Sequence, residues 1–168
     1  MSKFNYYIFW ARYKRKDMYL LWREGLEEKD SFWTSDNQLV PAFRSSEKIV
    51  ELAKKQHLSL NAEPPKLLDF DAVASWMDNP EKMPPAASLE AWNIFTDVSQ
   101  SAGKPFDGDT KSPVRNRVFE LLYVTAGIWR RPGHPWGPVV WPRQERKVLR
   151  RILLQGFRLW NKHVYDAD

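Results

Sequence analysis

The side chains with the clearest capacity for chemistry are the carboxylates in the centre of the sequence. Between positions 61 and 110, nine Asp and Glu stand against three Lys and Arg. Five of them flank predicted helix ends and turns: Asp71, Asp78, Glu81, Asp107 and Asp109. Exposed carboxylates attract a basic protein surface and raise its rate of association. A pair such as Asp107 with Asp109 also has metal-ligand chemistry, but Asp is favoured in turns for backbone reasons, so no metal site is predicted.

The last third of the chain has the opposite charge. Positions 111–168 hold 12 Lys and Arg against 4 Asp and Glu. Most of these cations fall on one face of a predicted terminal helix, and they include Arg143, Lys147, Arg150, Arg151 and Arg158. Together with Trp129, Trp136 and Trp141, they have the chemistry of phosphate binding and base stacking. We favour the plainer interpretation, a solvated helix face with the tryptophans in the core, so a nucleic acid is the alternative partner and not the expected one.

No residues with catalytic or cofactor-binding spacing occur in the sequence. His57, His134 and His163 lie in different predicted elements, and none has a second histidine at metal-ligand spacing. His134, in the constrained sequence GHPWG, is the best candidate for a general base, although a lone loop histidine is usually structural. The chain has no cysteine, no glycine-rich phosphate loop and no G-x-S-x-G motif. We therefore predict a protein with no catalytic residues, no metal and no cofactor.

Composition predicts a single domain over residues 1–168. The chain is 43% hydrophobic and has 9 Trp and 9 Phe, enough for a sizeable core. The apolar N-terminus lacks a signal-peptide cleavage site, and no apolar run approaches the roughly 20 residues of a membrane-spanning helix. Together with the absence of cysteine, this predicts a cytoplasmic protein without a membrane partner. The sequence does not determine the oligomeric state, and a monomer is assumed.

The first third of the chain predicts β structure. Segments 5–13 and 18–23 are rich in aromatic and β-branched residues, and apolar side chains occupy both faces, as in central strands. Segments 31–34 and 38–43 flank a turn-forming Ser-Asp-Asn sequence and are interpreted as a second hairpin. Pro41 cannot donate a hydrogen bond to a ladder, so we expect this last strand at an exposed edge.

Helical periodicity begins at Ser45. Helices are predicted over 45–57, from about 69 to 78, and over 88–101, 113–129 and 142–163, with a short strand over 66–68. The terminal helix is long and amphipathic. Asp97 lies beside the apolar stripe of the third helix, where an arginine is its expected partner. The predicted fold class is α+β, a small antiparallel sheet of about four strands from the N-terminal third packed against four or five helices.

Three segments, in this order, resemble a family of small bacterial immunity proteins. They are LLDFDAVASWMDNPE at 67–81, LEAWNIFTDVSQS at 89–101, and a connector rich in Pro and Trp whose last tryptophan precedes ERKVLRRILLQGFRLW. The matching positions are mostly apolar and include Phe70, Trp76, Trp92, Phe95 and Leu153. The family protects cells against the toxin domains of contact-dependent growth inhibition and related polymorphic toxin systems.

The resemblance implies inhibition by binding, without chemistry by the protein itself. A member of such a family covers the active site or substrate-binding surface of its cognate toxin domain, here expected to be a nuclease such as a tRNase. A nuclease holds phosphates with positive charge, so the expected toxin-binding residues are the five carboxylates named above. The strand over 38–43 is an alternative, because an exposed edge accepts a strand from a partner. The sequence does not choose between these two surfaces.

Overall fold

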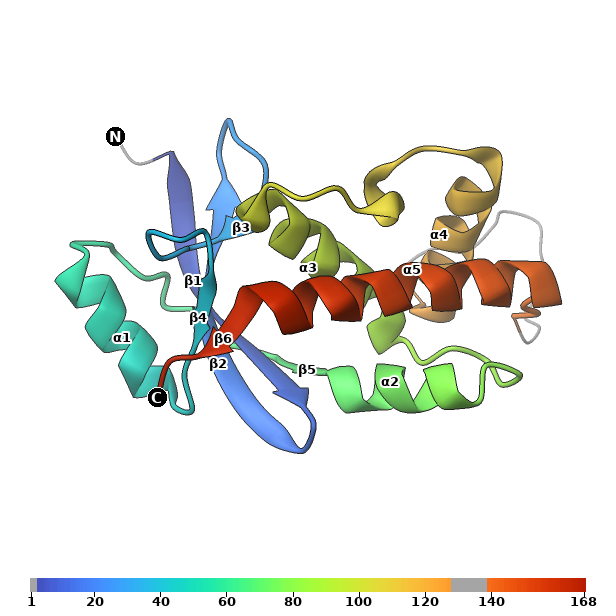
Figure 1. The fold of residues 1–168 in the computed structure, drawn as a ribbon, viewed down its shortest axis with the longest axis horizontal. Coiled ribbons are helices and arrows are strands. Elements are labelled where there is room, and N and C mark those ends of the chain that lie inside the picture. Colours follow the sequence, from blue (N-terminus) through green and yellow to red (C-terminus); the bar gives the residue numbers. More distant parts are fainter. Residues whose placement is uncertain (1–2, 128–138) are drawn as a thin grey trace.

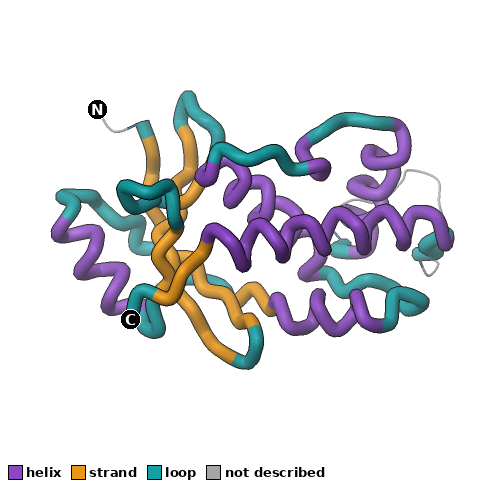
Figure 2. Tube along the Cα trace, viewed as in Figure 1, coloured by secondary structure: helices purple, strands orange, loops and turns teal. Residues whose placement is uncertain are grey.

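The computed structural model describes residues 3–127 and 139–168. Its strands are β1 (Phe4–Tyr13), β2 (Lys16–Gly25), β3 (Ser31–Phe32), β4 (Val40–Ala42), β5 (Leu67–Asp69) and β6 (Val164–Asp166). Its helices are α1 (Ser46–Lys55), α2 (Phe70–Asp78), α3 (Ala87–Ala102), α4 (Pro113–Thr125) and α5 (Arg143–His163), with a short 3-10 turn, η1 (Asp107–Asp109), between α3 and α4. Figure 1 shows these elements in space, and Figure 2 distinguishes helices from strands by colour.

The main sheet is built on the long hairpin of β1 and β2. The two strands pair antiparallel from Phe4 opposite Gly25 to Tyr13 opposite Lys16. β3 joins β2 antiparallel and β5 joins β1 parallel, which gives the order β3-β2-β1-β5. The hairpin strands are therefore central, as predicted, and the α+β class is confirmed. The sheet is mixed and not purely antiparallel, because the chain passes through α1 before β5 and such a long crossover permits a parallel neighbour.

The second hairpin and the exposed edge strand predicted from the sequence are wrong. The chain does turn where expected, and the Ser35 amide donates to the Leu39 carbonyl at 2.9 Å. Beyond the turn, β4 leaves β3 and pairs in parallel with the C-terminal strand β6. On its other side, Phe43 exchanges two backbone hydrogen bonds with Tyr19 of β2, at 2.7 and 2.9 Å. β4 is buried between these neighbours and does not offer the exposed edge that strand addition requires, because the chain after α5 returns to cover it.

Helices cover both faces of the hairpin (Figure 1). α1 lies on one side, where it contacts β2, and α2, α3 and α5 lie on the other. Side chains alternate along a strand, so Leu20 enters the main core while Leu21 is buried on the α1 side, as are Ile49 and Ala53 of α1. Apolar residues occur at both odd and even positions of β2 because helices cover both faces of the sheet.

Local capping residues set several helix boundaries. The Asp69 carboxylate accepts a hydrogen bond from the Ala72 amide at 3.2 Å and begins α2. The Ser112 hydroxyl accepts from the Arg115 amide at 3.2 Å and begins α4. Gly103 ends α3 in the left-handed conformation, with φ 63°. These boundaries depend on residues within one turn of the helix end, which is why the sequence predicts them.

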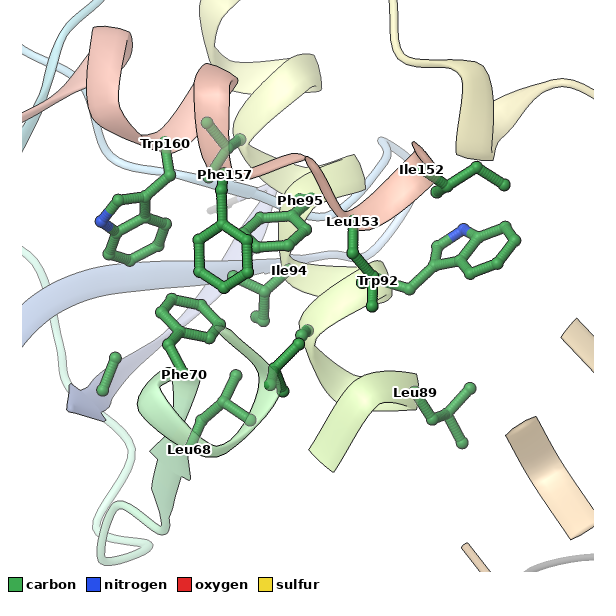
Figure 3. Close-up of a cluster of buried hydrophobic side chains, with 14 of the residues drawn as sticks. Leu68, Phe70, Leu89, Trp92, Ile94, Phe95, Ile152, Leu153, Phe157 and Trp160 are labelled. Carbon is green, nitrogen blue, oxygen red and sulfur yellow. The ribbon is translucent and has the colours of Figure 1, made fainter. Parts of the chain in front are cut away.

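Aromatic side chains from three helices meet in the centre of the core (Figure 3). Phe70 of α2 contacts Phe95 of α3 and Trp160 of α5, with ring centroids 5.4 and 4.8 Å away. Phe157 of α5 contacts Phe70 and Phe95, at 5.7 and 4.9 Å. Such ring pairs contribute about 0.5–1.5 kcal/mol each beyond the apolar area that they bury. This aromatic cluster therefore fixes α2, α3 and α5 relative to one another.

α3 and α5 approach closely because position 156 has no side chain. A Cβ on Gly156 would stand 2.0 Å from the Phe95 ring, far inside van der Waals contact. Gly156 is buried within α5, where glycine costs a helix about 0.5–1 kcal/mol relative to alanine. The fold accepts this cost because the Phe95 ring occupies the space that a Cβ would take.

A partly buried carboxyl group lies between α3 and β2. Asp97 accepts a hydrogen bond from the indole Nε1 of Trp22 at 2.9 Å, so its partner is a tryptophan and not the arginine expected from the sequence. Burial disfavours the charged form and raises the pKa of Asp97 to about 7, although the Trp22 hydrogen bond lowers it. The negative charge of Asp30 raises the pKa further. Asp97 therefore titrates near neutral pH in the folded protein.

Replacing Gly156 by alanine is expected to lower the free energy of unfolding by about 1–3 kcal/mol, the usual cost of overpacking, although alanine is the better helix former. Urea denaturation measures the change. Phe95→Leu removes the ring that a Cβ at position 156 would meet, so Gly156→Ala should cost less in that background. Equal costs in the two backgrounds would contradict the close contact.

The free energy of unfolding is expected to fall as the pH rises from about 4 to about 7. In this window the unfolded chain ionises Asp97 at its ordinary pKa while the folded chain keeps the proton, so the folded state binds more protons. The loss is on the order of 2 kcal/mol after allowance for solvent screening. Asp97→Asn keeps an acceptor for Trp22 without the charge, and it should be more stable than the wild type at about pH 8 but not at about pH 4. Parallel pH profiles for the two proteins would refute the assignment.

Candidate functional site

Asp71 has a structural role, because its carboxylate binds the turn of the β1–β2 hairpin. Its two carboxylate oxygens accept the backbone amides of Lys14 and Arg15, at 2.7 and 2.9 Å. These two residues form the tight turn of the β1–β2 hairpin, and both have positive φ, 53° and 62°. Residues other than glycine are strained in that conformation, and the acceptors that Asp71 provides offset the strain. The structure thus assigns Asp71 to the hairpin, a role that the sequence analysis missed when it grouped Asp71 with the toxin-binding residues.

Two arginines of α5 hold residues 77–86, which comprise the last two residues of α2 and the turn before α3 and which we call the α2–α3 loop. Arg146 donates to the carbonyls of Pro80 and Glu81, at 3.2 and 2.5 Å. Arg150 donates through Nε to the carbonyl of Met77, near the C-terminal end of α2, at 2.9 Å. The last carbonyls of a helix carry partial negative charge, so a cation there is stabilising. Arg150, one of the residues of the alternative nucleic-acid-binding surface, therefore has a structural contact.

This loop presents two acidic side chains on a fixed backbone. Trp76 donates through Nε1 to the Lys82 carbonyl at 2.8 Å and holds the loop from inside. Asp78 and Glu81 are exposed, and their carboxylates have no hydrogen bond or ion pair with any residue that the structure describes. Met83 follows them and is 57% exposed. An apolar side chain within a charged rim is typical of a protein-binding surface.

Asp107 and Asp109 lie on η1, in the connector between α3 and α4. The Asp107 carboxylate is 3.9 Å from Arg115, and the Asp107 amide donates to the side chain of Gln155 in α5 at 2.9 Å. Asp109 is exposed and lines a cavity of about 840 Å³. Figure 1 shows this connector and the α2–α3 loop on opposite sides of α5. The acidic residues expected to form one patch therefore form two separate groups.

The cavity beside Asp109 has a row of aromatic side chains in its wall. Trp92 contacts Phe119 with ring centroids 5.1 Å apart, and Phe119 contacts Tyr123 at 5.2 Å. Arg115 also lines the cavity, and its Nε is buried without an acceptor among the described residues. A cavity of this size lies within the range of sites that receive small molecules or partner side chains. The sequence marked Trp92 as a core position only and carried no signal for the cavity.

The basic residues of α5 lie along one face of the helix, as predicted. Five of them are exposed and make no hydrogen bond or ion pair within the described ranges: Arg143, Lys147, Arg151, Arg158 and Lys162. The N-terminal half of this face adjoins the α2–α3 loop, because Arg146 and Arg150 contact that loop. None of the described helices, α5 included, combines the length and apolar character that a membrane-spanning helix needs.

The described histidines do not take part in a metal-binding cluster. Among residues 3–127 and 139–168, no three His, Asp or Glu side chains gather closely enough to hold a metal ion. His57 is exposed just after α1. His163 is buried at the end of α5, and burial together with the charges of Lys162 and Lys104 lowers its pKa, so it is neutral at pH 7. His134 lies outside the described residues.

The end of the Pro- and Trp-rich connector packs into the core. Trp141 is buried and donates through Nε1 to the Thr125 hydroxyl at 2.9 Å, which joins the start of α5 to the end of α4. α4 ends at Thr125, before the boundary near residue 129 that the sequence predicts. Trp129 and Trp136, the other tryptophans of this region, lie outside the described residues.

Comparison with known proteins supports the fold without identifying a function. No protein-family model matches the chain, and no curated protein matches it. Among solved structures, the chain is similar to the C-terminal domain of SatS, determined in complex with bromine, with a TM-score of 0.52. The two sequences are 10% identical, and the alignment covers 98% of this chain and 94% of that chain. At this identity the likeness concerns the fold alone.

Replacing Asp71 by alanine is expected to lower the free energy of unfolding by about 1–2 kcal/mol, because two hairpin amides lose a charged acceptor. Urea denaturation measures the change. Asp78→Ala is the matched control, since it removes an exposed carboxylate without a described partner and should stay within about 0.5 kcal/mol of the wild type. Equal effects of the two substitutions would argue against a structural role for Asp71.

Proposed function

We propose that this protein is an immunity protein that binds and neutralises the nuclease toxin domain of a contact-dependent growth inhibition or related polymorphic toxin system. It acts by obstructing the active site or substrate-binding surface of the toxin, and its own side chains carry out no reaction. The proposal starts from the resemblance of three segments to such immunity proteins. The first segment contains α2, and the other two form most of α3 and α5, the helices that meet in the aromatic cluster.

The observation that carries the proposal is the α2–α3 loop. It offers the free carboxylates of Asp78 and Glu81 on a backbone that Arg146, Arg150 and Trp76 hold in place. A preorganised loop loses little conformational entropy on binding, so more of the contact energy appears as affinity. The two carboxylates complement the positive charge with which a nuclease holds the phosphates of its substrate.

Met83 adds an apolar contact to the same loop. It lies two residues after Glu81 and exposes more than half of its surface. Methionine is flexible and adapts to irregular apolar surfaces. Interfaces draw most of their affinity from a few buried anchors, while the surrounding charges set specificity and association rate. We therefore expect a toxin contact centred on Met83, with Asp78 and Glu81 at its rim.

The second acidic group, Asp107 and Asp109, is the less favoured toxin contact. Asp107 lies close to Arg115, which reduces the negative potential of this group. The group also lies on the other side of α5 from the α2–α3 loop, so a partner must span α5 to reach both (Figure 1). Of the two acidic groups, the α2–α3 loop is the one that combines free carboxylates, an exposed apolar side chain and a backbone held by hydrogen bonds.

Growth rescue tests the proposal directly. A toxin domain encoded beside this gene should arrest growth when expressed, and co-expression of this protein should restore growth. The purified pair should form a complex in which the nuclease activity of the toxin is lost. If the protein bound neither that domain nor any member of a panel of contact-dependent toxin nucleases, the proposal would be wrong.

Reversing the two loop charges, with Asp78→Lys and Glu81→Lys together, is expected to slow association with the toxin domain by at least about 10-fold at low salt. Stopped-flow fluorescence measures the rate, which should fall with rising salt for the wild type and change little for the variant. Glu27→Lys with Asp36→Lys is the matched control, because it makes the same change in net charge at exposed loop positions elsewhere. An equal slowing by the control would assign the effect to net charge and not to the loop.

A further inference from the structure

α5 concentrates positive charge on one helix. It contains seven Lys and Arg and a single acidic residue, Glu145, which is 3.5 Å from Arg117 of α4. Residues four positions apart are neighbours on a helix surface, and like charges there destabilise the helix. α5 has four such pairs: Arg143 with Lys147, Lys147 with Arg151, Arg146 with Arg150, and Arg158 with Lys162. The protein therefore keeps an arrangement that costs it stability when it stands alone.

Some of the basic residues of α5 make structural contacts, and the others have no partner among the described residues. Arg146 and Arg150 hold the α2–α3 loop through backbone carbonyls. Five exposed cations without a described partner remain. One of them, Lys162, lies in the last turn of α5, and we call the other four the basic row: Arg143, Lys147, Arg151 and Arg158. Residues 1–2 and 128–138, outside the description, contain no Asp or Glu, so they bring no side-chain carboxylate to the row. The row extends about 22 Å along α5, at the rise of an α-helix.

We propose that the basic row binds the phosphate backbone of a nucleic acid strand. A strand presents a negative charge every few ångströms, and cations that bind it release its counterions, which favours binding. Three of the four residues are arginines, whose planar guanidinium donates two parallel hydrogen bonds to a phosphate. Bound phosphates would also relieve the repulsion between the like charges of α5. The inference goes beyond the proposed immunity function, because it concerns another face of the molecule and another partner.

The opposite face of α5 argues against a membrane surface as the partner. A helix that lies on a membrane inserts its apolar face among the lipid chains. In α5 this face is already packed in the core, where Leu149, Ile152 and Leu153 are buried. The basic row therefore has no apolar face of its own to insert into a bilayer.

The lack of an apolar anchor on α5 argues against an acidic protein. Protein interfaces take most of their affinity from buried apolar or aromatic anchors. The large hydrophobic side chains exposed in the described part of the chain are Leu26, Met83, Val140 and Tyr165, and none of them belongs to α5. Val140 and Met83 lie near the N-terminal end of α5, so an apolar contact is available only at one end of the row. Along the rest of the row the exposed face offers charge without an apolar anchor, which fits a phosphate backbone better than a folded partner.

Fluorescence anisotropy with a labelled single-stranded RNA of about 20 nucleotides tests the proposal on the full chain. Four phosphate contacts give a slope of about −3 in the logarithm of the association constant against the logarithm of salt, so affinity should fall roughly 50-fold between about 50 and 200 mM salt. Polyglutamate and anionic lipid vesicles serve as competing probes. RNA should bind more tightly than either.

Lys147→Glu separates binding from stability. It replaces two like-charge pairs, with Arg143 and Arg151, by two opposite-charge pairs, so the thermal midpoint should stay the same or rise. RNA affinity should fall at least about 10-fold, because the row loses its central cation and gains an anion. Arg151→Gln removes one charge from the row and should reduce affinity severalfold. Lys48→Glu makes the same change in net charge on α1 and should affect RNA binding much less.

Three results would each overturn the proposal. The first is no RNA binding by the wild type below about 100 μM at low salt, since non-specific nucleic-acid binding reaches that range even at physiological salt. The second is an equal loss of affinity in Lys147→Glu and Lys48→Glu. The third is tighter binding to polyglutamate or to vesicles than to RNA. Each leaves the growth-rescue test of the immunity function unaffected, because that test concerns the toxin and the α2–α3 loop.

Discussion

Two consecutive helices, α2 and α3, and the distant helix α5 meet at the ring of Phe70. Its contacts with Phe95 and Trp160, and the close approach that Gly156 permits, hold α2, α3 and α5 together. Aromatic rings of this size pack with little freedom, so the positions of the helix ends follow from the cluster. α2 begins at Phe70, and its next residue, Asp71, reaches the turn of the β1–β2 hairpin. The aromatic cluster thus also positions the sheet relative to the helices.

Several charged residues stabilise the fold through contacts within the protein and are therefore not free to bind a partner. Asp71 holds the hairpin turn, Arg146 and Arg150 hold the α2–α3 loop, and the partly buried Asp97 accepts a hydrogen bond from Trp22. Once these roles are assigned, free carboxylates remain on the α2–α3 loop and free cations remain on the exposed face of α5.

The two proposed binding surfaces adjoin without overlapping. The α2–α3 loop presents carboxylates and Met83, while the basic row follows the exposed face of α5, and Arg146 and Arg150 stand where the two meet. An inhibitor of a nuclease meets both a basic protein and, at the same place, the nucleic acid on which that protein acts. Two adjacent surfaces of opposite charge on one rigid framework can bind a basic protein and a nucleic acid side by side. Neither binding event requires the other surface to change its conformation.

The sequence by itself determined the α+β class, the central hairpin, most helix boundaries and the charged face of α5. These features depend on periodicity and on caps such as Asp69 and Gly103, whose partners lie within a few residues. Only the tertiary structure decided that β4 pairs with β6, that Asp71 is engaged by the hairpin and that the expected acidic patch is divided in two. The Asp71 contact joins residues 57 positions apart, and β4 meets a strand from the other end of the chain. Such contacts follow from how the aromatic cluster places the helices in space, and no local pattern of residues encodes them.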